Sequence, residues 1–123
     1  MPEKDILIVD DDAGVRDALA EVLRDGGYGV DLAATAAEAK RLLSEYRYGV
    51  VFADWRLPDG DGALIASLAE AAGSYAFVMS GYLPRMLPGN VDVRQTLMKP
   101  VRPAELLAAV RACIGTAAAA PGA

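Results

Sequence analysis

Near the N-terminus the chain reads Ile6-Leu7-Ile8-Val9-Asp10-Asp11-Asp12, and this segment is the most informative about the fold. Its four consecutive apolar residues indicate a strand that is buried on both faces, as in the interior of a parallel sheet. The acids that follow directly mark the carboxyl end of this strand. We therefore expect an α/β fold in which polar side chains gather at one edge of a parallel sheet.

Strands and helices alternate along the rest of the chain. Apolar runs predict the strands, and apolar residues three or four positions apart predict the helices. Asp12 is expected to cap the first helix, and Thr35 and Glu38 to form a capping box at the second. The further strands are predicted at 28–33, 49–53, 76–79 and about 95–98, and the helices at 15–23, 35–46, 61–70 and 103–114.

Five strands that alternate with helices imply one domain built on an open, doubly wound, five-stranded parallel sheet. The domain is predicted to cover 1–114, and the alanine-rich segment 115–123 to be a disordered tail. Pro84 and Pro88 follow the fourth strand. Because proline inside a helix costs about 3 kcal/mol or more, helix four is predicted to be short or absent.

The composition excludes several classes of function. The chain has 17 acidic and 12 basic residues and a net charge of −5, which disfavours a nucleic-acid surface. Without histidine, and with Cys113 alone, it has no histidine-based chemistry, internal disulfide or cysteine zinc site. Cys113 is predicted to pack in the core. With no apolar run of roughly 20 residues and no signal peptide, the chain is predicted to be cytoplasmic, without a membrane partner.

Polar residues stand at four predicted strand ends. Asp10 and Asp11 follow the first strand, Asp54 the third, Ser80 the fourth and Lys99 the fifth. Each alone could be an ordinary loop residue. In open α/β sheets, however, ligands bind just beyond the carboxyl ends of the strands, so we expect these five side chains to converge into one site.

The charges of this site predict its chemistry. At an effective dielectric constant near 20, two close carboxylates repel by roughly 4 kcal/mol, and Lys99 cannot offset three acids. A divalent cation is the expected further partner, and an all-oxygen ligand set favours Mg²⁺, with Mn²⁺ as an alternative. A carboxylate beside such an ion can accept a phosphoryl group, while Lys99 and the Ser80 hydroxyl stabilise its oxygens.

These residues resemble the signature blocks of the response-regulator receiver family, over residues 5–114. The matching blocks are Ile6-Leu7-Ile8-Val9-Asp10-Asp11-Asp12, Asp54-Trp55-Arg56-Leu57-Pro58-Asp59-Gly60-Asp61-Gly62, Met79-Ser80-Gly81 and Lys99-Pro100. The resemblance implies a flavodoxin-like sheet of order 2-1-3-4-5. It also implies a phosphoacceptor switch of a two-component phosphorelay, which catalyses only its own phosphorylation and dephosphorylation and is otherwise no enzyme.

The resemblance assigns a role to each site residue. Asp54 is the phosphoacceptor, and Ser80 and Lys99 contact the phosphoryl group. Mg²⁺ is held by Asp54, by Asp11, by Asp10 directly or through water, and by the backbone carbonyl of Arg56. The implied partners are a histidine kinase or histidine phosphotransfer protein and an unknown downstream protein, with no direct contact to nucleic acid. The surroundings of Ser80 and Lys99 are similar to those of receivers fused to, or serving, hybrid histidine kinases.

Three features allow more than one interpretation. Thr96 stands where the family places an aromatic switch residue, which disfavours a serine–aromatic switch. Arg56 and Tyr82 either tune the lifetime of the phosphoryl group or form a solvated rim. The alternatives to a phosphorylated switch are a receiver-like interaction module that acts without phosphorylation, and a phosphatase with an aspartate nucleophile.

Overall fold

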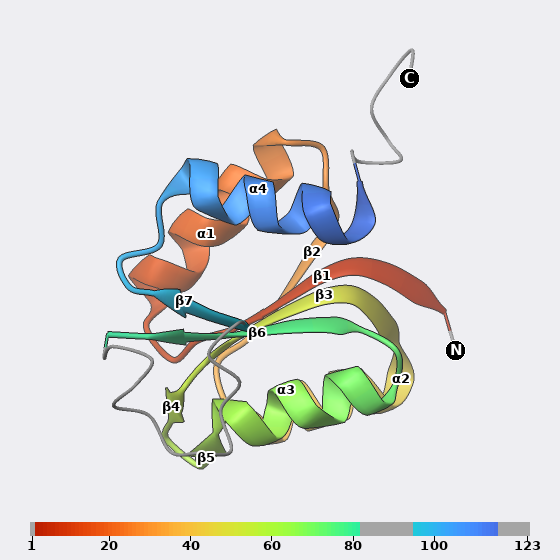
Figure 1. Cartoon of the computed structure of the whole chain (residues 1–123). Helices are drawn as coiled ribbons and strands as arrows, with labels where there is room; N and C mark the ends of the chain where they lie inside the picture. Colours follow the sequence, from red (N-terminus) through yellow and green to blue (C-terminus); the bar gives the residue numbers. More distant parts are fainter. Residues whose placement is uncertain (1, 82–94, 116–123) are drawn as a thin grey trace.

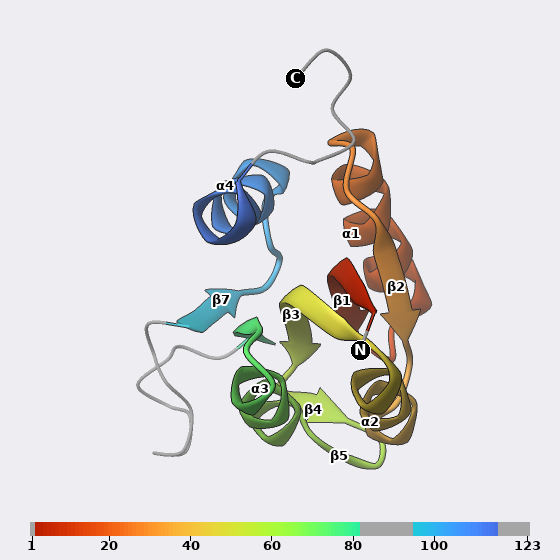
Figure 2. The same cartoon turned by 90° about the vertical axis from the view of Figure 1, so that its right-hand side faces the viewer.

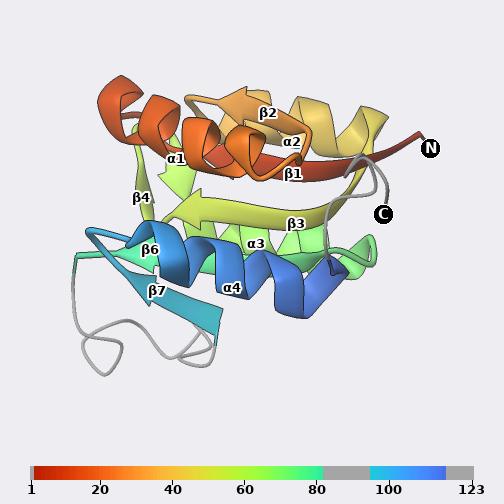
Figure 3. The same cartoon turned by 90° about the horizontal axis from the view of Figure 1, so that it is seen from above.

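The computed structural model describes residues 2–81 and 95–115. Five parallel strands form one sheet in the order β2-β1-β3-β6-β7, which Figure 3 shows from above. Counted along the chain, these are the five predicted strands in the predicted order 2-1-3-4-5. Their bounds are β1 Glu3–Val9, β2 Val30–Ala33, β3 Arg47–Asp54, β6 Tyr75–Ser80 and β7 Thr96–Met98.

Two pairs of helices cover the two faces of the sheet (Figures 1 and 2). The first pair is α1 Ala13–Asp25 and α4 Pro103–Ile114, and the second is α2 Ala36–Glu45 and α3 Gly62–Ala71. Each face has its own apolar cluster, and the residues from Ile6 to Val9 supply side chains to both and are fully buried. Cys113 packs against the cluster beneath α1 and α4, as predicted.

The predicted caps lie at the starts of α1 and α2. Asp12 Oδ1 accepts a hydrogen bond from the Val15 amide at 3.1 Å, and Thr35 Oγ1 accepts one from the Glu38 amide at 3.1 Å. The Glu38 carboxylate accepts from the Ala34 amide at 3.2 Å, one residue before its expected partner. Both helices therefore begin where their polar side chains meet unpaired backbone amides.

The second strand begins at Val30, two residues later than predicted. Tyr28 instead belongs to the end of α1, where its amide donates to the Leu23 carbonyl at 3.1 Å and the Gly27 amide donates to Arg24 at 2.9 Å. Gly27 has a φ of 92°, a left-handed conformation that glycine adopts without steric cost. This helix-ending motif takes Tyr28 out of the strand.

A short antiparallel hairpin follows the third strand, where the sequence predicted no strand. It pairs β4 Arg56–Leu57 with β5 Gly60–Asp61. Of the predicted tail 115–123, only Gly115 is described: its amide donates to the Arg111 carbonyl at 2.9 Å, and its carbonyl accepts from the Tyr28 hydroxyl at 2.7 Å. The predictions for helix four, for Tyr82 and for the rest of the tail lie outside the described residues. Among the helices at 2–81 and 95–115, none is long and apolar enough to cross a membrane.

Candidate functional site

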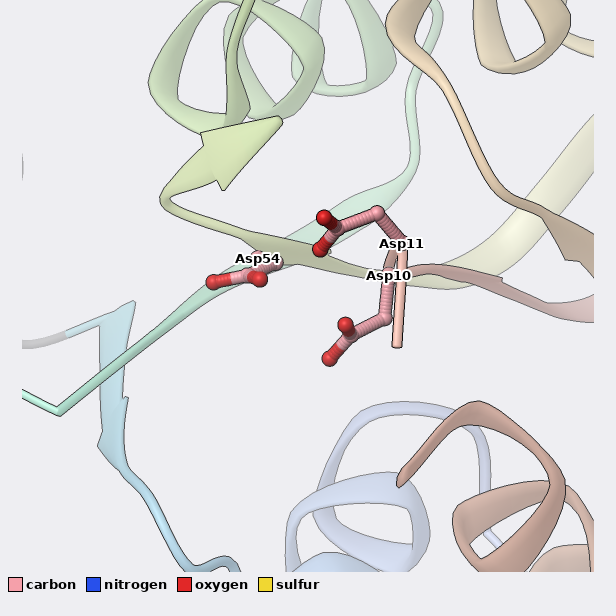
Figure 4. Close-up of side chains that lie close together, drawn as sticks. All are labelled: Asp10, Asp11 and Asp54. Carbon is pink, nitrogen blue, oxygen red and sulfur yellow. The ribbon is translucent and has the colours of Figure 1, made fainter. Parts of the chain in front are cut away.

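Three aspartates meet at the carboxyl edge of the sheet. Asp10 and Asp11 follow β1 and Asp54 ends β3, and their carboxylates lie on the same side of the strand ends (Figure 4). One oxygen from each lies within 4.8 Å of the others. Asp10 is fully buried, Asp54 is partly buried and Asp11 is exposed. The predicted convergence of these acids is confirmed.

Lys99 joins two of the three acids. Its Nζ lies 2.8 Å from Asp10 Oδ2 and 3.2 Å from Asp54 Oδ2. The other Asp10 oxygen, Oδ1, accepts a hydrogen bond from the Asp12 amide at 2.9 Å. Both oxygens of the buried carboxylate therefore have partners. Three carboxylates and one ammonium leave the site with two negative charges in excess.

The carboxyl group of Asp54 is perturbed by its surroundings. Partial burial and the charge of Asp10 raise its pKa above the ordinary aspartate value, while Lys99 and a backbone hydrogen bond from Arg56 act in the opposite direction. For Lys99, burial lowers the pKa, but the hydrogen bond to Asp10 and the charges of both acids outweigh it, so its pKa is raised. Lys99 is therefore an ammonium ion at neutral pH. Perturbed groups of this kind gather at functional sites.

The sheet register brings Ser80 and Lys99 to the same edge. Ser80 ends β6, is 2 % exposed and stands opposite Met98 of β7. The Lys99 amide donates to the Ser80 carbonyl at 2.8 Å, and the Lys99–Pro100 peptide bond is cis. All five predicted site residues thus lie at the ends of neighbouring strands.

Arg56 lies in β4, two residues after Asp54. Its backbone hydrogen bond reaches the Asp54 carboxylate, and its exposed guanidinium lies 5.1 Å from the centre of the Trp55 ring. That its carbonyl serves as a metal ligand stays a prediction.

Two side-chain contacts of segments next to the site were not predicted from the sequence. Arg16, on α1, donates from Nη1 to the Asp10 carbonyl at 2.9 Å and so fixes the loop that carries the first two acids. Asp59 accepts hydrogen bonds from the amides of Ala36 and Ala37, at the start of α2. No short sequence pattern predicts either contact. The Asp59 contacts join residues 22 and 23 positions apart, which only the fold brings together.

The donor set fits a hard divalent cation. Within the part of the chain that the structure describes, Asp10, Asp11 and Asp54 are the one group of three acidic, histidine or cysteine side chains with this spacing. Carboxylate oxygens without nitrogen or sulfur suit Mg²⁺ or Mn²⁺. A bound cation would also stabilise the site, because the carboxylates in each close pair repel each other.

Comparison with known proteins adds independent evidence. Residues 6–111 match the model of the response regulator receiver domain family. The aerobic respiration control protein ArcA of Escherichia coli K12 is 32 % identical over 105 residues, which cover 82 % of this chain and 44 % of ArcA. The response regulator Rre1 of Synechocystis is 35 % identical over 114 residues, covering 86 % of this chain and 49 % of Rre1. The chain thus spans about half the length of these relatives.

The fold has close counterparts among solved structures. The CheY-like response regulator receiver domain protein from Methanospirillum hungatei superimposes with a TM-score of 0.77 and 30 % identity, covering 89 % of this chain and 91 % of that one. The strand order, the acids at the carboxyl edge and the family match over 6–111 agree. This chain belongs to the response regulator receiver domain family.

Proposed function

We propose that this chain is a phosphoacceptor switch of a two-component phosphorelay, in which Asp54 takes a phosphoryl group from a histidine kinase or a histidine phosphotransfer protein. The observation that carries the proposal is the cluster of Asp10, Asp11 and Asp54 within 4.8 Å, with Lys99 between Asp10 and Asp54. Repulsion among the three carboxylates destabilises the protein when no cation is bound. Such a cluster is expected at a site that binds a cation and accepts a phosphoryl group.

The proposed metal ligands are Asp10, Asp11, Asp54 and the backbone carbonyl of Arg56. Mg²⁺, or Mn²⁺ in its place, supplies positive charge that lets an anionic carboxylate approach an anionic phosphoryl group. Lys99 and the Asp12 amide already donate to the two oxygens of the buried Asp10. We therefore expect the exposed Asp11 to contact the cation more directly than Asp10 does.

The transfer itself needs a nucleophile and compensation of charge. An Asp54 oxygen forms a bond to phosphorus while the bond from phosphorus to the donor histidine nitrogen breaks, and the electron pair stays on that nitrogen. The product on Asp54 is an acyl phosphate. Lys99, already 3.2 Å from Asp54, pairs with the phosphoryl oxygens, and the Ser80 hydroxyl donates to another. Water later hydrolyses the acyl phosphate, at a rate that Arg56 can influence from the edge of the site.

The output follows from the new charge. A phosphoryl group adds a charge near −2, and it competes with Asp10 for the single ammonium of Lys99. Since Lys99 follows β7, we expect the surface around β6 and β7 to change and to bind or release a downstream protein in the cytoplasm. With a net charge of −5, this domain is not expected to contact nucleic acid directly.

Intact-mass spectrometry tests the proposal. Incubation with Mg²⁺ and a small phosphodonor such as acetyl phosphate should add one phosphoryl mass to the wild type and to Asp25→Asn, an exposed acid at the end of α1. The Asp54→Asn variant should gain none. No added mass in the wild type would refute phosphoacceptor function, and an undiminished gain in Asp54→Asn would place the acceptor elsewhere.

A further inference from the structure

The turn of the β4–β5 hairpin is attached to the start of α2. Asp59 Oδ1 accepts from the Ala36 amide at 2.7 Å, and Asp59 Oδ2 accepts from the Ala37 amide at 3.0 Å. Amides in the first turn of a helix have no partner within the helix, and the helix dipole favours a negative charge there. These two bonds lower the pKa of Asp59, so that its carboxylate is charged at neutral pH.

The N-terminus of α2 therefore has two caps of different origin. The side chain of Thr35, the local cap, accepts from the Glu38 amide, and the Asp59 carboxylate accepts from the amides of Ala36 and Ala37. Thr35 directly precedes α2, and the hydrogen bond that its side chain accepts comes from that helix. Asp59 belongs to the segment that follows the phosphoacceptor, so its bonds also restrain that segment.

Packing supports the attachment of the hairpin. A Cβ placed on Gly60 would lie 3.0 Å from the Ala36 Cβ, so the hairpin and the helix are in close contact. Leu57 is 8 % exposed and belongs to the same apolar cluster as Ala36. The turn is thus held by two charge-assisted hydrogen bonds and by apolar contacts on both of its strands.

The attached turn leads directly to the site. Arg56 pairs with Asp61 in the hairpin, the Gly62 amide donates to the Trp55 carbonyl at 2.9 Å, and Arg56 reaches the Asp54 carboxylate through its backbone. A shift of the turn would therefore move the backbone of Trp55 and Arg56 relative to Asp10 and Asp11.

We propose that Asp59 is a positioning residue for the phosphoacceptor site: by fastening the β4–β5 turn to α2, it holds the Arg56 backbone where a divalent cation can use it. The inference rests on the proposed function of the Asp54 site. It adds a residue that touches neither the cation nor the phosphoryl group and acts through the hairpin.

The test compares Asp59→Ala with Thr35→Ala in the full chain. Both variants remove a cap from the same helix end, but only Asp59→Ala releases the hairpin. Two quantities are measured at a temperature where circular dichroism shows every variant folded: the Mg²⁺ dissociation constant by calorimetry, and amide hydrogen exchange at Gly62 without metal.

We expect Asp59→Ala to weaken Mg²⁺ binding roughly tenfold, as loss of supporting contacts around metal ligands does, and to speed exchange at Gly62. Thr35→Ala should leave both quantities within about twofold of the wild type, and Asp59→Asn, which keeps one oxygen acceptor, should fall between.

The outcomes separate this inference from the proposed function. Equal effects of Asp59→Ala and Thr35→Ala, or no effect of Asp59→Ala on a wild-type protein that binds Mg²⁺, would overturn the positioning role alone. A wild type that binds no Mg²⁺ would overturn the metal-dependent function as well, and the exchange rate at Gly62 would still show whether Asp59 holds the hairpin.

Discussion

Gly62 shows how closely the phosphoacceptor is packed at the scale of single residues. A Cβ at this position would overlap the Asp54 carbonyl oxygen and would lie 2.7 Å from the Asp54 carbonyl carbon. Real Cβ atoms do not approach backbone so closely, so a side chain here must displace either α3 or the end of β3. That Gly62 lies against Asp54 itself could be seen only in the fold.

We therefore predict that Gly62→Ala impairs the site more than an ordinary glycine substitution does. The variant should lose about 1–3 kcal/mol of unfolding free energy through overpacking, and its phosphorylation by acetyl phosphate should slow at least tenfold, roughly the cost of misplacing a reacting group. Gly29→Ala is the matched control, because a Cβ there would meet only the Asp5 side chain at 3.6 Å. Equal phosphorylation rates in the two variants would show that close packing at Gly62 does not position Asp54.

The raised pKa of Asp54 implies that the free energy of unfolding depends on pH. Burial and the charge of Asp10 raise this pKa, so the folded state binds the Asp54 proton more tightly than the unfolded state does. Stability is consequently lost as pH rises from the unfolded-state pKa through the folded-state pKa, and the ionised Asp54 destabilises the metal-free protein at neutral pH. Asp54→Asn should be more stable than the wild type at pH 7 with a chelator present, and this advantage should shrink in acid.

Urea unfolding with and without Mg²⁺ measures this effect. At about 100 times its dissociation constant, Mg²⁺ should stabilise the wild type by about 2.7 kcal/mol and Asp54→Asn by much less. A variant that is less stable than the wild type in chelator, at every pH, would show that the ionised Asp54 carboxylate does not destabilise the metal-free protein.

At the scale of the elements, two kinds of local pattern allowed prediction: continuous burial of apolar residues and side-chain capping of helix starts. The continuous run Ile6-Leu7-Ile8-Val9 predicted the central strand, and the helix starts at Asp12 and Thr35 followed from their side-chain oxygens. The β4–β5 hairpin was missed because each of its strands has two residues, too few to show alternation. Asp59 was missed for a different reason, since its partners come from another part of the chain.

A second cluster of polar groups joins the starts of three strands, at the opposite end of the sheet from the acids. The buried Tyr48 hydroxyl of β3 donates to Asp31 Oδ2 of β2 at 2.5 Å, and Lys4 Nζ of β1 lies 3.0 Å from the same oxygen. Burial and the bond to Asp31 raise the pKa of Tyr48, so the phenol keeps its proton. The cluster is expected to stabilise the fold without taking part in phosphorylation.

The variant Tyr48→Phe tests whether this cluster stabilises the fold without affecting phosphorylation. Removing a hydroxyl that donates to a charged group should lower the unfolding free energy by about 1.5–3 kcal/mol. The rate of phosphorylation at Asp54 should stay unchanged at temperatures where the variant is folded. Tyr75→Phe, on a side chain that is 53 % exposed, provides the control and should change neither quantity. A slower phosphorylation in Tyr48→Phe alone would show that the two ends of the sheet are coupled.

At the scale of the whole molecule, the parallel sheet explains why the site could be read from the sequence. All five strands run in one direction, so residues that are far apart in the chain but follow strand ends meet at one edge. Asp10, Asp54, Ser80 and Lys99 follow this rule, and the structure brings them together. The ion pairs of Lys99 with Asp10 and Asp54 could not be predicted from the sequence, because they depend on the positions of the side chains. The roles of these residues in phosphoryl transfer remain predictions.

The proposed function depends on the binding of one hard divalent cation by the acids at the sheet edge, beside Asp54. Anomalous diffraction from crystals grown with Mn²⁺ can detect this ion, since Mn²⁺ replaces Mg²⁺ and can be located unambiguously. We predict one strong peak in contact with the carboxylates of Asp11 and Asp54 and with the Arg56 carbonyl, lost in Asp11→Ala crystals. Crystals in which Mn²⁺ is absent from this cluster, or bound only elsewhere, would contradict the claim.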